Sequence, residues 1–100
     1  MSAFDHTALD DVIHGRLRLG IMAYLSTASP VPFLELKAKV NATDGNLSTH
    51  LTKLEEAGYV RIEKKFEAKK PRTNVHLTAA GRKAWIGYLD KLQSLISAAE

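Results

Sequence analysis

The chain has 100 residues, of which 45% are hydrophobic and 25% are charged, and this composition is typical of one small globular domain rather than of a disordered or repeat protein. It contains no cysteine, which excludes disulfides, thiolate zinc sites, iron–sulfur clusters and thiol nucleophiles. No apolar run approaches the roughly 20 residues of a membrane span, and the first residues lack a signal segment. We therefore expect a single cytoplasmic domain over residues 1–100 that makes no membrane contact.

The net charge is only +3, but its distribution along the chain is uneven. Residues 53–83 contain nine basic and four acidic side chains, whereas the segments before and after each have one more acidic than basic residue. A basic segment of this kind commonly meets phosphate groups, and a solvated charged surface is the alternative.

Helical periodicity dominates the first part of the chain. The segment 12–25 is predicted to be a helix whose buried face carries residues at three- and four-residue spacing: Ile13, Leu17, Ile21 and Tyr24. A break at His14-Gly15 would leave a short separate helix over 8–13. The segment 26–32, with two prolines, is predicted to be a connection, and a short helix through Phe33, Leu36 and Val40 follows it.

The next helix begins after a predicted tight turn over 41–43. Thr43 is a natural N-cap and Asp44 complements the positive helix start. Leu47, Leu51 and Leu54 mark the buried stripe, and Gly58 can supply the left-handed residue that ends the helix.

From Tyr59 the period changes to two, which indicates a β-hairpin. Half-buried strands are predicted through Val60, Ile62 and Phe66 and through Thr73, Val75 and Leu77, joined by an exposed cationic loop over 67–71 that is longer than a tight turn. Thr78 is expected to cap the final helix. Gly81 in its first turn suggests close backbone packing.

This order of elements is that of a winged helix-turn-helix, mainly α with a β-hairpin wing. In this fold the second helix of the motif enters the DNA major groove, and we expect the basic wing to contact the DNA backbone or a minor groove. With its leucines buried, the 44–58 helix turns short hydrogen-bonding groups and one cation outward. The predicted DNA-binding residues of this recognition helix are Thr43, Gly45, Asn46, Ser48, Thr49, Thr52 and Lys53, and those of the wing are Lys65, Lys69, Lys70 and Arg72.

The segments TDGNLSTHLTKLEEAGYV (43–60), KKPRT (69–73) and LTAAGR (77–82) resemble the small winged-helix regulators related to the MarR and ArsR repressors. The resemblance implies a homodimeric transcription regulator, in which Asn46, Ser48, Thr49 and Lys53 correspond to recognition-helix positions. The last helix has Asp90 but no histidine, so the resemblance does not extend to a metal effector, and the effector is unknown.

A dimer is also expected from burial, because a 100-residue body cannot cover all the apolar surface of the last helix. The predicted dimer residues are Trp85, Tyr88, Leu89, Leu92, Leu95 and Ile96, assisted by the segment 8–13. We thus expect dimerisation helices at both ends of the domain.

The histidines are interpreted as structural. His50 is expected to be packed or half-buried beside the leucine stripe, and His76 to face solvent. His6, Asp10 and His14 share helical spacing, but acidic residues near a helix start commonly serve the helix dipole, and we predict no metal or other cofactor.

Two other classes of function compete with DNA binding. No Walker loop, dinucleotide glycine motif, nucleophile elbow or triad spacing is present, so no enzyme is predicted. The alternative function is a winged-helix protein-interaction module without DNA binding. The basic cluster at Lys69, Lys70 and Arg72 favours duplex DNA, because a protein-binding module has no need of it.

Overall fold

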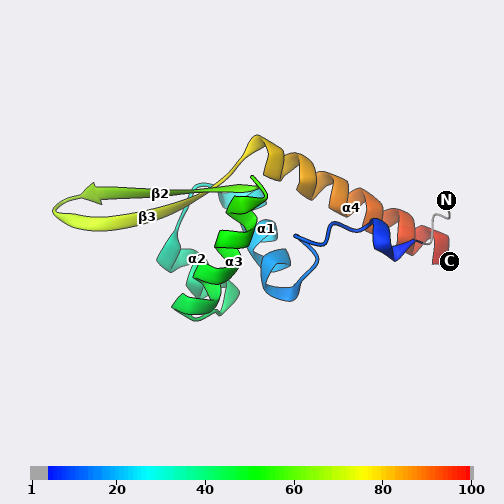
Figure 1. Cartoon of the computed structure of the whole chain (residues 1–100), viewed down its shortest axis with the longest axis horizontal. Coiled ribbons are helices and arrows are strands. Elements are labelled where there is room, and N and C mark those ends of the chain that lie inside the picture. The colour runs from blue at the N-terminus through cyan, green and yellow to red at the C-terminus, as the bar shows by residue number, and fades with distance from the viewer. Residues whose placement is uncertain (1–4, 100) are drawn as a thin grey trace.

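The computed structural model describes residues 5–99 and places a three-helix body between a long β-hairpin and a long C-terminal helix (Figure 1). Its elements in chain order are the 3₁₀ helix η1 (His6–Ala8), α1 (Arg16–Ala28), β1 (Val31–Pro32), α2 (Phe33–Val40), α3 (Asp44–Glu56), β2 (Val60–Glu67), β3 (Lys70–Leu77) and α4 (Ala79–Ala99). The three strands form an antiparallel sheet in the order β1-β3-β2. This is the winged helix-turn-helix that the sequence predicts.

The start of the chain differs from the prediction in one respect. The break at Gly15 is confirmed, since this residue is the N-cap of α1. The short helix over 8–13 is wrong: Ala8 ends η1, and residues 9–13 turn around Asp10. The Asp10 carboxylate accepts hydrogen bonds from the N–H groups of Val12 at 2.8 Å and Ile13 at 3.2 Å. An aspartate side chain that binds nearby N–H groups competes with the helical hydrogen bonds.

The predicted connection over 26–32 is shorter than expected. α1 continues to Ala28, and Val31 and Pro32 form β1, which pairs with Val75 and Asn74 of β3. Two residues with a proline give no alternating pattern, so the sequence carried no strand signal here.

The helix-turn-helix agrees with the prediction. Asn41 ends α2 in the left-handed conformation, with φ of 53°. The Thr43 hydroxyl caps α3 by accepting a hydrogen bond from the Asn46 N–H at 3.1 Å. Lys37 and Asp44 join the two helices through an ion pair of 2.7 Å. α3 ends at Glu56, and Gly58 (φ 82°) then turns the chain toward the wing.

The hairpin is longer and its turn tighter than predicted. Glu67 pairs with Lys70, so the turn consists only of Ala68 and Lys69, both with positive φ as a type I′ turn requires. The predicted five-residue loop is therefore wrong. Phe66, predicted to be half-buried, is exposed because the hairpin extends past the body (Figure 1).

The core lies between the three helices of the body and the base of the sheet. Its fully buried side chains are Ile13, Ile21, Met22, Leu25, Val31, Leu36, Leu47, Leu54 and Val75. The close packing predicted at Gly81 is confirmed, since a Cβ placed there would lie 2.0 Å from the carbonyl oxygen of Tyr59. α4 can begin against the base of the wing only because this residue has no side chain.

Candidate nucleic-acid interface

The outer face of α3 is polar along its length. Leu47, Leu51 and Leu54 are buried, and the helical period places Thr49 on the opposite side. All residues predicted for the recognition helix are exposed: Thr43, Gly45, Asn46, Ser48, Thr49, Thr52 and Lys53. Because its inner stripe is fully buried, the helix presents these groups on a fixed backbone.

Within residues 5–99, the unpaired acidic side chains of α3 lie at its end, since Asp44 in the first turn forms an ion pair with Lys37. A Cβ at Gly45 would have nothing within 4 Å, so a large partner can approach the backbone there. Glu55 and Glu56, both exposed, follow in the last turn, and their carboxylates would repel phosphate. The Glu55 carboxylate also accepts a hydrogen bond from the Ile62 N–H at 3.3 Å, which connects α3 to the wing.

His50 fixes α3 against α1. Its Nδ1 lies 2.9 Å from a terminal nitrogen of Arg18, whose Nε donates to the Val12 carbonyl at 2.5 Å. Since Arg18 is a donor only, the histidine must accept with an unprotonated nitrogen. Partial burial and, to a smaller extent, the Arg18 charge lower the pKa of His50. The predicted half-buried histidine is confirmed.

The two faces of the wing differ. Ile62, Lys64 and Phe66 share the face that packs toward α3, because alternate strand residues share a face. The opposite face carries Lys65 paired with Arg72 and Glu67 paired with Lys70. The four predicted wing cations, Lys65, Lys69, Lys70 and Arg72, are exposed. Lys65 makes long ion pairs with Glu63 at 3.7 Å and Glu67 at 3.8 Å.

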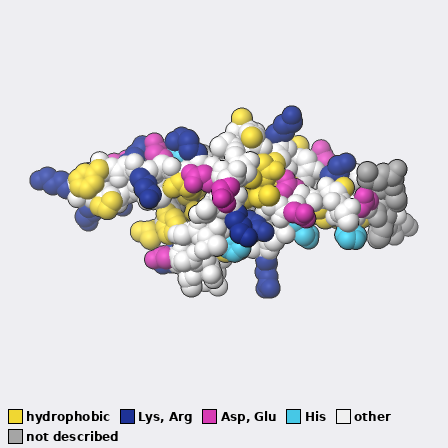
Figure 2. Space-filling view, viewed as in Figure 1, with side chains coloured by type: hydrophobic (Ala, Val, Ile, Leu, Met, Phe, Trp, Pro, Cys, Tyr) yellow, Lys and Arg dark blue, Asp and Glu magenta, His cyan; other side chains and the backbone are white. Residues whose placement is uncertain are grey.

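Lys64 belongs to the candidate interface but was missed in the sequence. It lines a groove of about 640 Å³ between α3 and the wing, together with Phe33, Ser48, Leu51, Thr52, Glu55, Ile62 and Thr73. Strand alternation could have found it, since Lys64 shares a face with Ile62 whereas the predicted Lys65 does not. In the same view as Figure 1, several Lys and Arg side chains lie along the visible face of the wing (Figure 2).

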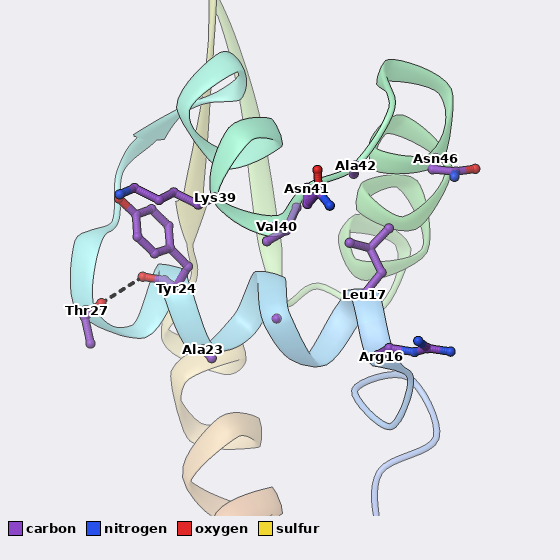
Figure 3. A pocket seen from close by; sticks show the side chains of 11 residues that line it. Arg16, Leu17, Ala23, Tyr24, Thr27, Lys39, Val40, Asn41, Ala42 and Asn46 are labelled. Atoms are coloured by element: carbon purple, nitrogen blue, oxygen red, sulfur yellow. Dashed lines mark hydrogen bonds between the residues drawn. The ribbon is translucent and has the colours of Figure 1, made fainter.

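A second groove, of about 760 Å³, lies between α1, α2 and the start of α3 (Figure 3). Its floor is mostly apolar, and Arg16 and Lys39 supply positive charge from α1 and α2. The Lys39 ammonium lies 5.9 Å from the centre of the Tyr24 ring. Asn46 also lines this groove, which therefore adjoins the outer face of α3.

The predicted dimer residues on α4 separate into two stripes. Tyr88 is only 3% exposed, stacks on Trp85 with ring centres 5.9 Å apart and lies 2.9 Å from His14 through its hydroxyl. Leu92 and Leu95 are half-buried on this same inner stripe. Leu89 and Ile96 are exposed by 43% and 49%, and Ile86, which was not predicted, by 54%.

The remaining histidine prediction needs correction. His76 is half-buried rather than solvent-facing, and its Nε2 lies 2.9 Å from a carboxylate oxygen of Glu63. This contact, followed by the nearby cations, lowers the pKa of Glu63. Within residues 5–99, no three acidic or histidine side chains are grouped to hold a metal ion. In the same residues, no helix has the length and apolarity needed to cross a membrane.

Comparison with known proteins places this interface in context. Residues 17–96 match the family described as winged helix DNA-binding domain. The chain is 36% identical over 84 residues to the uncharacterized protein MJ0432 of Methanocaldococcus jannaschii, covering 84% of this chain and 91% of that protein.

Solved structures agree with the family match. A transcriptional regulator homologue from Pyrococcus horikoshii OT3 superimposes with a TM-score of 0.83 and 31% identity, covering 89% of this chain and 88% of that one. A MarR-family transcriptional regulator from Silicibacter pomeroyi superimposes with a TM-score of 0.65 and 24% identity, covering 88% of this chain and 56% of that one. The MarR-like fold inferred from the sequence is thus confirmed.

Proposed function

The chain belongs to the winged helix DNA-binding domain family, and from this premise we propose that it is a sequence-specific, double-stranded DNA-binding transcription regulator. The observation that carries the proposal is the polar outer face of α3 beside a cationic wing. The family and fold are those of regulators rather than of enzymes.

In the proposed complex, the first three turns of α3 enter the major groove. Asn46 and Thr49 offer amide and hydroxyl groups to base edges, since asparagine can bond to adenine through two hydrogen bonds. Gly45 allows the helix start to approach the sugar-phosphate backbone. The wing supplies Lys69, Lys70 and Arg72 to phosphates, which sets affinity more than sequence preference.

We further propose that two copies bind DNA together through α4. The support is the exposed outer stripe of Ile86, Leu89 and Ile96, which is spaced as in a helix that packs on a partner. A twofold dimer would present two α3 helices to successive major grooves about 34 Å apart. Leu89 and Ile96 retain the interface role predicted for them, and Ile86 joins them.

The proposal is tested by selecting tightly bound duplexes from a random-sequence pool. The expected result is enrichment of a palindrome whose half-sites are about 10 base pairs apart, with affinity that falls steeply as salt rises. Asn46→Ala and Thr49→Ala should each change the preferred base at one position in each half-site, at a cost of about 1–3 kcal/mol. No enriched sequence, or an affinity insensitive to salt, would contradict the proposal.

The Asn46 and Thr49 variants also need a reference on non-selected DNA. Each variant should bind random duplexes as the unmodified protein does, because phosphate contacts by the wing remain. An equal loss on selected and random duplexes would assign the two residues to phosphate contact instead of base recognition.

A further inference from the structure

The recognition helix α3 is tied to α1 by one polar side-chain contact in addition to its buried leucines. His50 Nδ1 lies 2.9 Å from a terminal nitrogen of Arg18, and within residues 5–99 no other side-chain hydrogen bond joins these two helices. Arg18 is itself held in place, because its Nε donates to the Val12 carbonyl in the turn before α1. The contact therefore fixes α3 to a part of the chain that lies outside the helix-turn-helix.

The position of His50 on α3 links this contact to the residues that are proposed to read bases. His50 directly follows Thr49 and comes about one helical turn after Asn46. The buried leucines decide which face of α3 meets the core, but apolar packing has no preferred direction, whereas a hydrogen bond weakens steeply away from its best angle. The Arg18–His50 hydrogen bond is therefore suited to fix the rotation of α3 about its own axis.

A small rotation of α3 would be enough to disturb base recognition. The side chains of a helix end about 5–6 Å from its axis, so a rotation of about 10° moves their tips by roughly 1 Å. Hydrogen bonds to base edges tolerate less than this, since donor and acceptor must lie about 2.7–3.2 Å apart. Contacts from the wing to phosphates do not depend on this rotation, because another element makes them.

The hydrogen bond between Arg18 and His50 exists only while the His50 ring is neutral. A guanidinium group is a donor and has no acceptor, so Nδ1 must keep its lone pair for it. Binding of a proton turns both ring nitrogens into donors and places two positive charges against each other at hydrogen-bond distance. Protonation of His50 therefore breaks the contact.

The charged groups around this contact come from α1, from the turn before α1 and from α3 itself. They are Arg18, Asp11, Lys53 and Glu56, which line one groove of about 410 Å³. Partial burial, followed by the charges of Arg18 and Lys53, lowers the pKa of His50. Within residues 5–99, neither of the two carboxylates forms an ion pair with the ring, so the ring is neutral at pH 7 and above.

We propose that Arg18 and His50 are positioning residues for sequence recognition: their hydrogen bond holds α3 in the rotation at which its outer face reads bases, and protonation of the ring releases it. The inference rests on the proposed function. At low pH the chain keeps its affinity for DNA in general, because the wing still contacts phosphates and the ring adds a positive charge. What it loses is the preference for its own sequence.

Proton linkage sets the size of the effect. If only the neutral ring supports base recognition, each protomer releases up to one proton when it binds the selected duplex at a pH below the pKa of His50. Log affinity for that duplex then falls by at most about one per pH unit and protomer, whereas affinity for a random duplex stays constant or rises. The ratio of the two affinities should fall about fivefold or more between pH of about 7.5 and about 5.

The test measures both affinities by fluorescence anisotropy at fixed ionic strength across this pH range. His50→Asn is the conservative variant, because its side-chain oxygen takes the place of Nδ1, accepts from Arg18 and does not titrate. It should keep the preference for the selected duplex over the whole range, and it also accounts for the titration of the other histidines. His50→Leu removes the acceptor and should reduce the preference about tenfold or more at every pH, as the loss of one base contact would.

The outcomes separate this inference from the proposed function. A protein that binds no duplex, or prefers no sequence at any pH, would overturn both. If the unmodified protein keeps its whole preference at pH of about 5, or if His50→Asn loses it to the same extent, only the role of the Arg18–His50 pair is overturned.

A purely structural role of the pair is tested on the same proteins. Circular dichroism shows the pH range over which each protein is folded, and the affinity ratios are compared within that range. If His50→Leu unfolds at lower urea concentration but is as selective as the unmodified protein, the contact serves stability alone and the inference fails. The pH series on the unmodified protein needs no substitution and decides the question even where a variant does not fold.

Discussion

Replacing Lys69, Lys70 and Arg72 together with alanine should reduce the salt dependence of DNA binding without changing sequence preference. All three side chains are exposed on the wing, and within residues 5–99 the ion pairs of the wing involve Lys65 and His76 rather than these three. Their charges are therefore available to neutralise phosphates.

The size of the effect follows from counterion release. Each neutralised phosphate adds about 0.9 to the slope of log affinity against log salt, so three contacts add roughly 2.7 per protomer and about 5 per dimer. Between about 50 and 200 mM salt, a slope of 2.7 alone corresponds to a loss of affinity of roughly 40-fold. The triple variant should lack this part of the salt dependence.

The assay is fluorescence anisotropy with one selected and one random duplex across that salt range. Lys65→Ala is the matched control, because Glu63 and Glu67 already lie near its ammonium group and its removal should change the slope by less than about 0.9. A triple variant whose slope equals that of the unmodified protein, or of Lys65→Ala, would refute the assignment of the wing to phosphates.

Three further predictions concern the scaffold. Gly81→Ala should lower the free energy of unfolding by about 3 kcal/mol or more, because the new Cβ would meet the backbone of Tyr59. Gly87→Ala is the control: it has open space around it and should raise the free energy of unfolding by about 1 kcal/mol. Urea denaturation measures both. Because the pKa of His50 is lowered in the folded state, the unfolded state binds more protons. The free energy of unfolding should therefore fall as pH drops below about 6.5. A fall of equal size in His50→Gln would contradict this. Leu89→Glu with Ile96→Glu should give folded monomers by analytical ultracentrifugation, and an unchanged sedimentation coefficient would exclude this stripe as the interface.

The helix-turn-helix was predictable because its signals are local. Leucine spacing determines the buried face of α3, and the Thr43 cap marks its start without reference to the rest of the fold. The hairpin turn was not predictable in this way, because Pro71 has no N–H to donate to a strand ladder and therefore favours a loop in the sequence. β1 pairs only as far as Asn74, so at Pro71 the outer side of β3 has no partner strand, and a proline is tolerated at such an edge.

The sequence alone could not predict which apolar residues of α4 are buried and which are exposed. Trp85 and Tyr88 recur at helical spacing, and so do Ile86 and Leu89, so periodicity alone cannot say which pair meets the body. Tertiary contact decides it: the turn around Asp10 directs His14 toward the Tyr88 hydroxyl, and the neighbouring stripe is left exposed. The sequence therefore predicts an apolar last helix, and the structure shows which part of it is exposed.

Tyr59 connects α3, the wing and α4, the three elements that would have to keep a fixed arrangement in the proposed dimer. The Tyr59 N–H donates to the Leu54 carbonyl at the end of α3, and its own carbonyl accepts from the Thr78 N–H before α4. Its hydroxyl donates to the Asp10 carboxylate at 2.5 Å, which raises the pKa of Tyr59 to about 12. Tyr59 thus connects α3, the base of the wing, α4 and the turn before α1. Since the same carbonyl excludes any side chain at Gly81, the angle between α3 and α4 is set here, and with it the separation of the two recognition helices in the proposed dimer.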